Sequence, residues 1–282
     1  TSVIRNSGKD LIQNLLTFFL FNHTGIFPED KWPKGIGVNG WITVDGEKMS
    51  KSKGNIISLR EMPEKFGVDC ARFTILSSGE DMDDPNWDSA FATALRGKLD
   101  QFYDFCIENY GKGKSEMREI DMWMESELQK TILRCTEAME NTSFRTALQA
   151  AYFELTNAIK WYTRRCNGEY NKRVISDVIK AQVKMLAPFT PFLSEEIWEK
   201  IGGKGYCSFS SWPKYDGKKI EERLEQGEKL VKQVLQDVVA VMKLAKVEKV
   251  NKLKLFVAES WKYKLYKVLS TIETHKFGQS LP

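Results

Sequence analysis

Apolar residues repeat every three or four positions between residues 91 and 186, and this helical period constrains the fold more than any other feature. The apolar positions form four sets: 91, 95, 99, 102 and 106; 124, 128, 132, 135 and 139; 147, 151, 155, 158 and 162; and 174, 175, 178, 179, 183 and 186. Each set lines one face of a helix. Asp121 is expected to cap the second helix, and Pro188 to stop the fourth. Thr190-Pro191 then opens a shorter helix that Gly202-Gly203 ends, so we predict an antiparallel helical bundle.

Composition indicates a globular protein of two domains, with a third begun. The 282 residues are 42% hydrophobic and 28% charged. No apolar run approaches the roughly 20 residues of a membrane span, and no signal peptide opens the chain, so we expect no membrane partner. The five cysteines are scattered, without a Cys-x-x-Cys pair, and only two histidines occur. This pattern favours reduced thiols in the cytoplasm and no metal site.

The segments on either side of the bundle carry mixed helix and strand signals. Before it, we expect helices over 11–21, 59–66 and 69–76, a loop over 27–34, and a strand or bent strand pair over 36–44. After it, a polar linker from 212 precedes a helix over 220–246, a strand over 252–258 and a helix over 261–270. The predicted fold class is therefore multidomain and mainly α: the end of a Rossmann-type α/β domain, an α-helical bundle, and the start of a small α/β domain.

Residues 48–55 read KMSKSKGN and directly follow the expected strand. Serine and glycine disfavour regular structure here, so a loop is expected. Such a loop can place lysine ammonium groups around a polyphosphate, while hydroxyls and backbone amides add hydrogen bonds. Most short charged runs are only solvated surface, and that is the competing interpretation.

The net charge of +4 conceals an asymmetry along the chain. From residue 240 onward there are nine lysines and three glutamates, a net of +6, which leaves −2 for the first 239 residues. A basic end suits a polyanionic partner.

Lys48–Ser52 is the KMSKS signature of class I aminoacyl-tRNA synthetases, and Gly54-Asn55 extends it. With the loop, strand and bundle together, the whole chain resembles the leucyl-tRNA synthetases of the archaeal and eukaryotic-cytosolic type. The matching stretches are SGKDLIQNLLTFFLFNHTGIFPEDKWPKGIGVNGWITVDGEKMSKSKGN, KWYTRR, LAPFTPFLSEEIWEKIGG and the pair Trp261-Lys262.

The resemblance implies ATP-dependent activation of leucine to leucyl-adenylate, followed by transfer to tRNA(Leu). ATP would be the co-substrate, with Mg²⁺ sharing the charge of its phosphates. Lys48 and Lys51 are the expected catalytic residues, because fixed cations stabilise the leaving pyrophosphate. The expected ATP-binding residues are Gly8, Asp10, Asn39, Gly40, Met49, Ser50 and Ser52. Asp10 could instead be only the cap of the helix over 11–21.

The family uses its bundle to bind tRNA, which makes the basic residues of this bundle candidates for phosphate contacts. They are Arg145, Lys160, Arg164, Arg165, Lys172 and Arg173. An ordinary solvated face is the alternative. The implied domains are 1–58, the end of the catalytic domain with the KMSKS loop; 59–115, a connecting helical region; 116–215, the anticodon-binding-type bundle; and 216–282, a long helix and the start of a C-terminal tRNA-binding domain.

The family's His-x-Gly-His motif is absent, since the histidines are His23 and His275. No insertion resembles an editing domain, which leucine selection is expected to need. We therefore expect a C-terminal half or split subunit that is inactive without an N-terminal half carrying both. Two alternatives stay open: another class I synthetase (isoleucyl, valyl or methionyl), and a non-catalytic tRNA-binding module.

Overall fold

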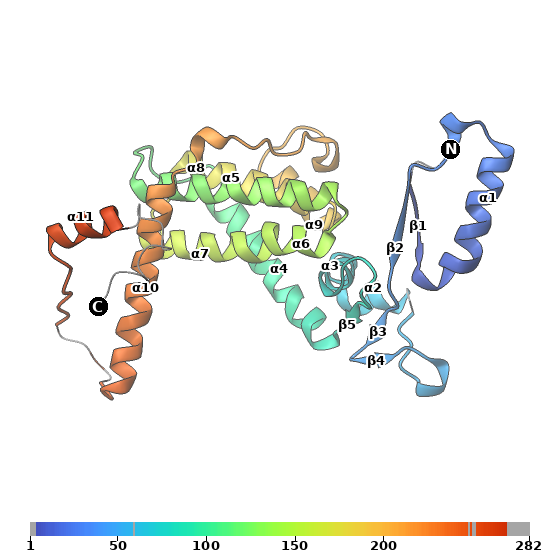
Figure 1. The fold of residues 1–282 in the computed structure, drawn as a ribbon, viewed down its shortest axis with the longest axis horizontal. Helices are drawn as coiled ribbons and strands as arrows, with labels where there is room; N and C mark the ends of the chain where they lie inside the picture. The colour runs from blue at the N-terminus through green and yellow to red at the C-terminus, as the bar shows by residue number, and fades with distance from the viewer. Residues whose placement is uncertain (1–3, 59, 248, 250–251, 270–282) are drawn as a thin grey trace, which may run out of the picture. The chain divides into compact units, whose positions relative to one another are not determined.

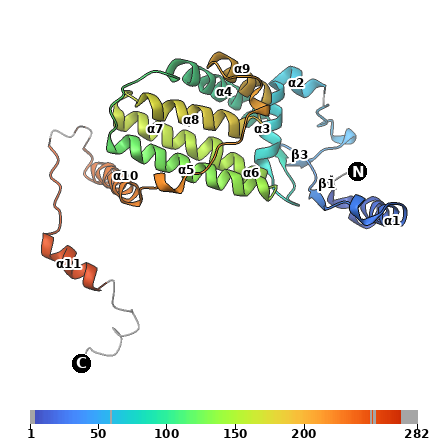
Figure 2. The same ribbon diagram turned by 90° about the horizontal axis from the view of Figure 1, so that it is seen from above.

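The computed structural model describes residues 4–58, 60–247, 249 and 252–269, with the backbone alone for 267–269. The chain divides into two compact units, residues 1–228 and 229–282. Figures 1 and 2 show the ribbon from two directions. The first unit contains every residue proposed for the nucleotide site, together with the bundle.

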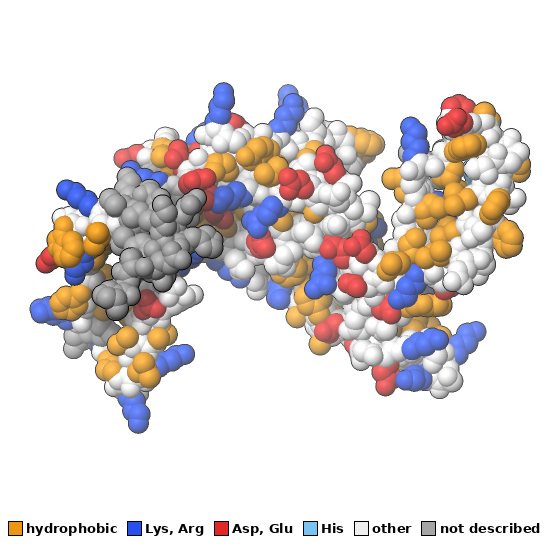
Figure 3. Space-filling view, in the orientation of Figure 1, with side chains coloured by type: hydrophobic (Ala, Val, Ile, Leu, Met, Phe, Trp, Pro, Cys, Tyr) orange, Lys and Arg blue, Asp and Glu red, His pale blue; other side chains and the backbone are white. Residues whose placement is uncertain are grey.

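The first unit begins with a β-α-β segment. Strand β1 (Ile4–Gly8) pairs in parallel with β2 (Gly35–Asn39), in a register that places Gly8 opposite Asn39. Between them, a 3₁₀ turn (Lys9–Leu11) and a π turn (Ile12–Leu16) lead into α1 (Thr17–Ile26). A further 3₁₀ turn (Glu29–Lys31) lies in the expected loop. The helix expected over 11–21 is therefore present but extends to Ile26, and Figure 3 shows hydrophobic side chains exposed along it.

A second small sheet follows, with strand order β4-β3-β5. Strand β3 (Thr43–Val44) forms a hairpin with β4 (Glu47–Lys48) and lies parallel to β5 (Asn86–Trp87). The hairpin turns at Asp45-Gly46, both with positive φ, as Asp-Gly favours in a two-residue turn. Of the two possibilities expected over 36–44, a single strand or a bent strand pair, the structure has the pair, as two strands in two sheets.

The predicted helical bundle is confirmed. Its helices and those leading to it are α2 (Glu61–Phe66), α3 (Val68–Ser78), α4 (Ser89–Asn109), α5 (Glu119–Glu140), α6 (Phe144–Leu148), α7 (Leu155–Cys166), α8 (Lys172–Leu186) and α9 (Pro191–Lys200). Helix α5 packs against α6, α7 and α8, which lie side by side in both views (Figures 1 and 2). The helix expected over 147–162 is divided by a π segment (Gln149–Glu154). The buried side chains of the bundle include Tyr162, Met124, Leu148, Ile179 and Phe189.

Helix ends follow local sequence signals, with one correction. Pro191 occupies the first turn of α9, and Gly202 after its end has a φ of 77°. Asp121 does not precede α5 as a cap, because the helix begins at Glu119 and Arg118 holds the N-cap position. The carboxylate of Asp121 instead reaches back from the first turn to accept a hydrogen bond from the backbone N–H of Arg118, at 2.7 Å.

Two 3₁₀ turns, Cys207–Phe209 and Gly217–Lys219, lie between α9 and α10 (Glu222–Leu244). The first two turns of α10, up to Glu228, belong to the first unit. In the second unit, α11 (Ser260–Leu269) matches the helix expected over 261–270, whose last residue lies outside the described residues.

The prediction of a strand over 252–258 is wrong, because these residues have no regular secondary structure. An alternating segment is stable as a strand only when it pairs, and no described strand pairs with it.

Candidate active site and nucleic-acid interface

Asn55 organises the KMSKS loop by bridging its two sides. Its Oδ1 accepts a hydrogen bond from the backbone N–H of Ser50 at 2.9 Å, and its Nδ2 donates to the carbonyl of Lys48 at 3.2 Å. Within the loop, Ser50 caps a 3₁₀ turn (Lys51–Lys53), with its Oγ 3.3 Å from the amide of Lys53 and 3.2 Å from Ser52 Oγ. Gly54 closes this turn with a left-handed φ of 66°. The loop is therefore a defined turn with its lysines exposed.

The three lysines of the loop have different surroundings. Lys53 Nζ forms an ion pair with Glu47 at 3.0 Å. Lys48 Nζ lies 5.8 Å from the ring centroid of Trp41, and Lys51 has no ion pair within the described part of the chain. Figure 3 shows Lys and Arg side chains gathered in the region of the β3-β4 hairpin. Two of the three charges are thus available to an anionic ligand, and they are the two predicted to be catalytic.

Met49 is less exposed than the lysines of the loop. It is half-buried and packs against the hydrophobic core of the first unit. An apolar anchor between two cations fixes which face of the loop is presented to solvent.

The first group of predicted ATP-binding residues meets at one edge of the β1-β2 sheet. Because the strands are parallel and Gly8 pairs with Asn39, both lie at carboxyl ends, where open α/β sheets bind ligands. Asp10 follows in the next turn, and a Cβ on Gly8 would lie 2.6 Å from Asp10 Oδ1. Glycine at position 8 therefore lets the carboxylate of Asp10 fold over the end of β1.

Asp84 connects the turn after β1 to the segment that follows β2, a role that sequence reasoning missed. Its Oδ1 accepts hydrogen bonds from Lys9 Nζ at 2.6 Å and from the Trp41 amide at 2.7 Å. The bond from Lys9 is the main cause that lowers the pKa of Asp84 below its ordinary value. Gly40 packs so closely here that a Cβ would lie 2.0 Å from the carbonyl oxygen of Asp83. The acidic run at 80–84 was a signal, but nothing local indicated its partners 43 residues or more away.

The six basic residues predicted to bind tRNA differ in whether they already form an ion pair with a carboxylate. Arg165 forms a double hydrogen bond with Glu228, at 2.9 and 3.0 Å, and Arg173 pairs with Glu125 at 2.6 Å. In each case the carboxylate raises the pKa of the arginine. All six are exposed, but the other four form no ion pair among the described residues: Arg145, Lys160, Arg164 and Lys172. Of these, Arg164 lies over the ring of Trp161, 5.8 Å from its centroid.

A buried polar network holds the α5, α7 and α8 ends of the bundle together. Arg118 donates two hydrogen bonds to the fully buried Asp121, at 2.9 and 3.0 Å, and Tyr162 Oη donates a third. Burial raises the pKa of Asp121, but these hydrogen bonds outweigh it and lower the pKa below its ordinary value. Tyr162 Oη also accepts from the amide of Asn171, which caps α8. All its members have partners within the fold, so we assign this network to stability.

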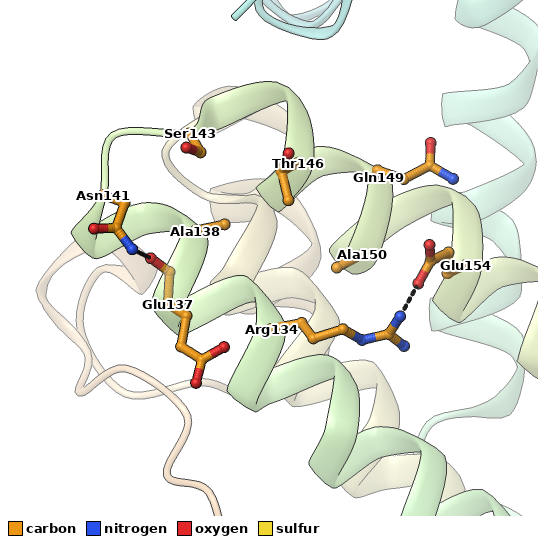
Figure 4. A pocket seen from close by; sticks show the side chains of 9 residues that line it. All are labelled: Arg134, Glu137, Ala138, Asn141, Ser143, Thr146, Gln149, Ala150 and Glu154. Atoms are coloured by element: carbon orange, nitrogen blue, oxygen red, sulfur yellow. Dashed lines mark hydrogen bonds and ion pairs between the residues drawn. The ribbon is translucent and has the colours of Figure 1, made fainter. Parts of the chain in front are cut away.

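A polar hollow of about 340 Å³ lies where α5 meets the π segment (Figure 4). Arg134 of α5 reaches across it to Glu154, at 2.7 Å, and Asn141 donates to the carbonyl of Glu137. Its one cation is therefore neutralised locally. No predicted site residue lines it.

Within the described residues, no group of three or more His, Cys, Asp or Glu side chains could hold a metal ion. None of the helices in the described ranges is long and apolar enough to cross a membrane.

Comparison with known proteins identifies two family matches. Residues 2–96 match the class I tRNA synthetases described as "tRNA synthetases class I (M)", and residues 121–257 match the "Anticodon-binding domain of tRNA ligase". The fold resembles the crystal structure of the LeuRS–tRNA–LeuAMS ternary complex of Agrobacterium radiobacter K84, with a TM-score of 0.66 and 22% identity over 77% of this chain and 29% of that one.

Curated relatives narrow the assignment. The chain is 43% identical to the leucine–tRNA ligase of Aeropyrum pernix over 93% of its own length and 27% of the relative's. For the leucine–tRNA ligase of Pyrococcus horikoshii the identity is 40%, over 98% of this chain and 29% of the relative. The chain thus spans less than a third of the length of these relatives. Over that span, it belongs to the leucine–tRNA ligase family of class I aminoacyl-tRNA synthetases.

Proposed function

We propose that this chain supplies the KMSKS loop and the tRNA-binding bundle of a leucine–tRNA ligase. That enzyme would activate leucine with ATP to leucyl-adenylate and transfer the leucyl group to tRNA(Leu). The observation that carries the proposal is the loop itself: it is held in one turn by Asn55 and anchored by Met49, and it leaves Lys48 and Lys51 without carboxylate partners among the described residues.

The chemistry requires positive charge where the pyrophosphate leaves. The leucine carboxylate attacks the α-phosphorus of ATP, the bond to the β,γ-diphosphate breaks, and negative charge accumulates on that leaving group. Lys51 and Lys48 would stabilise this charge in the transition state more than in the bound ATP. The hydroxyls of Ser50 and Ser52, 3.2 Å apart, would add hydrogen bonds to phosphate oxygens.

The adenosine is proposed to lie at the carboxyl edge of β1 and β2. There Asp10 would accept a hydrogen bond from a ribose hydroxyl, Gly8 would permit close approach, and Asn39-Gly40 would face the adenine. Mg²⁺ is proposed as the ion that accompanies ATP, because Mg²⁺ at phosphate sites is bound largely by phosphate oxygens and water.

For tRNA, we place the phosphate contacts first on Arg145, Lys160, Arg164 and Lys172. Arg165 and Arg173 are secondary candidates, because an arginine already paired with a carboxylate gains less from a phosphate.

The predicted division into residues 1–58, 59–115, 116–215 and 216–282 remains our proposal for the domains. An N-terminal partner segment with the His-x-Gly-His motif, the leucine pocket and the editing domain would complete the enzyme. We propose the cytoplasm as its location, which five free, buried cysteines support.

The test is leucine-dependent exchange of pyrophosphate into ATP, with the chain joined to the N-terminal segment of a leucine–tRNA ligase. Lys51→Ala should lower the exchange rate by roughly 10²- to 10³-fold, as loss of a transition-state electrostatic contact does. Lys53→Ala is the matched control, because this neighbouring lysine is paired with Glu47. Its rate should change less than threefold.

Two outcomes would overturn the proposal. Exchange that depends on isoleucine, valine or methionine, and not on leucine, would move the chain to another class I synthetase. Full exchange in Lys51→Ala, with tRNA binding retained, would instead favour a non-catalytic tRNA-binding module.

A further inference from the structure

Three strongly exposed aromatic side chains cluster near the start of α9: two of them line a hollow, and the third contacts one of these two. Phe192 is 66% exposed, Tyr206 67% and Phe209 85%. Phe192 and Tyr206 line the same hollow, of about 640 Å³, and the Tyr206 and Phe209 rings meet edge to face at 5.8 Å. We call these three residues the α9 aromatic patch. Single exposed aromatics are common, but a cluster around a hollow is characteristic of a binding surface.

The backbone under the patch is held by side chains from elsewhere in the first unit. Asp69 of α3 accepts hydrogen bonds from the amides of Phe192 and Leu193, at 3.4 and 2.6 Å. Its neighbour in the same helix, Arg72, donates to the carbonyls of Pro188 and Phe189, at 2.7 and 3.3 Å. The start of α9 is therefore fixed from both sides, and Phe192 is presented outward by a rigid support.

The loop that carries the other two rings is fixed in a similar way. Glu195 accepts hydrogen bonds from the amides of Cys207 and Ser208, at 2.6 and 2.9 Å. Gly203 lies against the indole of Trp198 so closely that a Cβ would be 2.3 Å from the ring. Aromatic anchors on preorganised backbone lose little conformational freedom on binding, which favours affinity.

The charged side chains that line the hollow determine which kind of partner can bind there. Glu195, Glu196 and Glu199 line it, whereas no lysine or arginine does. Glu196 pairs loosely with Lys200 at 3.6 Å, and Glu199 has no ion pair within the described residues. Carboxylates beside exposed rings repel phosphate and attract cations that can also stack on aromatic faces. Nucleic acid is therefore disfavoured at this surface.

We propose that the α9 aromatic patch is a docking surface for an arginine-rich segment of a protein partner. Guanidinium groups would stack on Phe192 and Tyr206 and hydrogen-bond to Glu199 and Glu196. Arginine is preferred over lysine because its planar, weakly hydrated group can do both at once. This surface is separate from the residues proposed for ATP and tRNA, so the proposal stands independently of the catalytic assignment.

The experiment measures binding of a fluorescein-labelled nona-arginine peptide to the full chain by fluorescence anisotropy, at 50 and 200 mM salt. We expect Phe192→Ala/Tyr206→Ala to weaken binding at least tenfold, and Glu199→Lys to weaken it by a similar factor. The matched controls are Phe256→Ala, an exposed ring outside the patch, and Glu140→Lys, an exposed carboxylate of α5. Each control should change the affinity less than twofold. A nona-lysine peptide should bind at least fivefold more weakly than nona-arginine.

Far-ultraviolet circular dichroism and the thermal midpoint of each variant establish that it folds. Equal affinity of nona-arginine for the parent chain and for both patch variants overturns the proposal, because binding then reflects acidic surface elsewhere. Equal affinity for nona-lysine and nona-arginine overturns the role of the rings. Self-association in sedimentation velocity that Phe192→Ala abolishes, with no effect on peptide binding, would assign the patch to a second copy of this chain instead.

Discussion

Removal of the Glu228 carboxylate is expected to loosen the start of α10 from the bundle. Glu228 is 9% exposed and accepts three hydrogen bonds: two from Arg165, at 2.9 and 3.0 Å, and one from Trp161 Nε1, at 2.8 Å. Loss of one partner of a fully buried ion pair costs about 3–5 kcal/mol. The Arg165 side chain is 39% exposed, so solvent can take over part of its interaction. We therefore expect Glu228→Ala to cost about 2–3 kcal/mol, and Glu228→Gln, which keeps an acceptor but loses the charge, about 1 kcal/mol.

Hydrogen exchange measured by mass spectrometry on the full chain tests this value locally, without requiring two-state unfolding. If amides at the start of α10 exchange through local opening, a loss of 2–3 kcal/mol makes exchange roughly 30- to 150-fold faster. Asp237→Ala is the matched control, since the one side-chain partner of this carboxylate among the described residues is Gln233, four residues away in the same helix. Its expected cost is below about 0.5 kcal/mol. A double-mutant cycle with Arg165→Ala should give a coupling of about 1–2 kcal/mol.

The result that would refute this reasoning combines two observations. Exchange at the start of α10 would be unchanged in Glu228→Ala, and Arg165→Ala would weaken tRNA binding as much as Arg164→Ala does. Arg165 would then act as a phosphate contact whose pairing with Glu228 is incidental. The proposed ranking of the basic residues in the bundle would have to be reversed.

Three further predictions concern the nucleotide site and the buried network. Asn55→Ala should lower leucine-dependent pyrophosphate exchange about tenfold while the thermal midpoint shifts by less than about 2 °C, because both loop bonds are lost but no core side chain is removed. Gly8→Ala should raise the KM for ATP severalfold in the same assay, since the new Cβ would displace the carboxylate of Asp10. Asp121→Asn should cost about 3 kcal/mol in urea unfolding at pH 7, because Arg118 loses a buried partner. The pKa of Asp121 is lowered on folding, so its contribution is present above the unfolded value near 3.8. The difference between parent and variant should therefore shrink as the pH falls below 4, and a difference that grows there would contradict the assignment.

Local patterns predicted the helices well because each helix buries its own apolar face. The positions 124, 128, 132 and 135 lie inside the core, as their spacing indicated. The π segment over 149–154 was not predictable in this way, since a single widened turn leaves the apolar pattern almost unchanged. Residues 252–258 show the opposite failure: their alternating pattern predicted a strand, but none of the strands in the described ranges pairs with them.

Pairings between distant residues were beyond sequence reasoning. Gly8 and Asn39 were each proposed for ATP, but only the parallel register of β1 and β2 shows that they are neighbours. Asp84 received no role because its partners, Lys9 and Trp41, are 75 and 43 residues away. The same limit applies to Arg165 and Arg173, for which the positive charge and the family's use of the bundle suggested a nucleic-acid contact. Their acidic partners come from other helices, and a single sequence does not reveal such pairs.

One physical distinction separates structural charges from those that we assign to ligands. Lys53, Arg118 and Arg165 each face a carboxylate, at 2.9–3.0 Å. An ion pair already formed must be broken or shared before it can bind a phosphate, which reduces the gain on binding. Lys51 bears no such cost in the described structure, although it lies two residues from Lys53 and has the same side chain. Exchanging the two environments tests the distinction directly: Glu47→Ala should free Lys53 and allow it to support part of the activity lost in Lys51→Ala. No recovery of pyrophosphate exchange in the double variant would mean that position in the turn, rather than freedom from a carboxylate, determines which lysine acts.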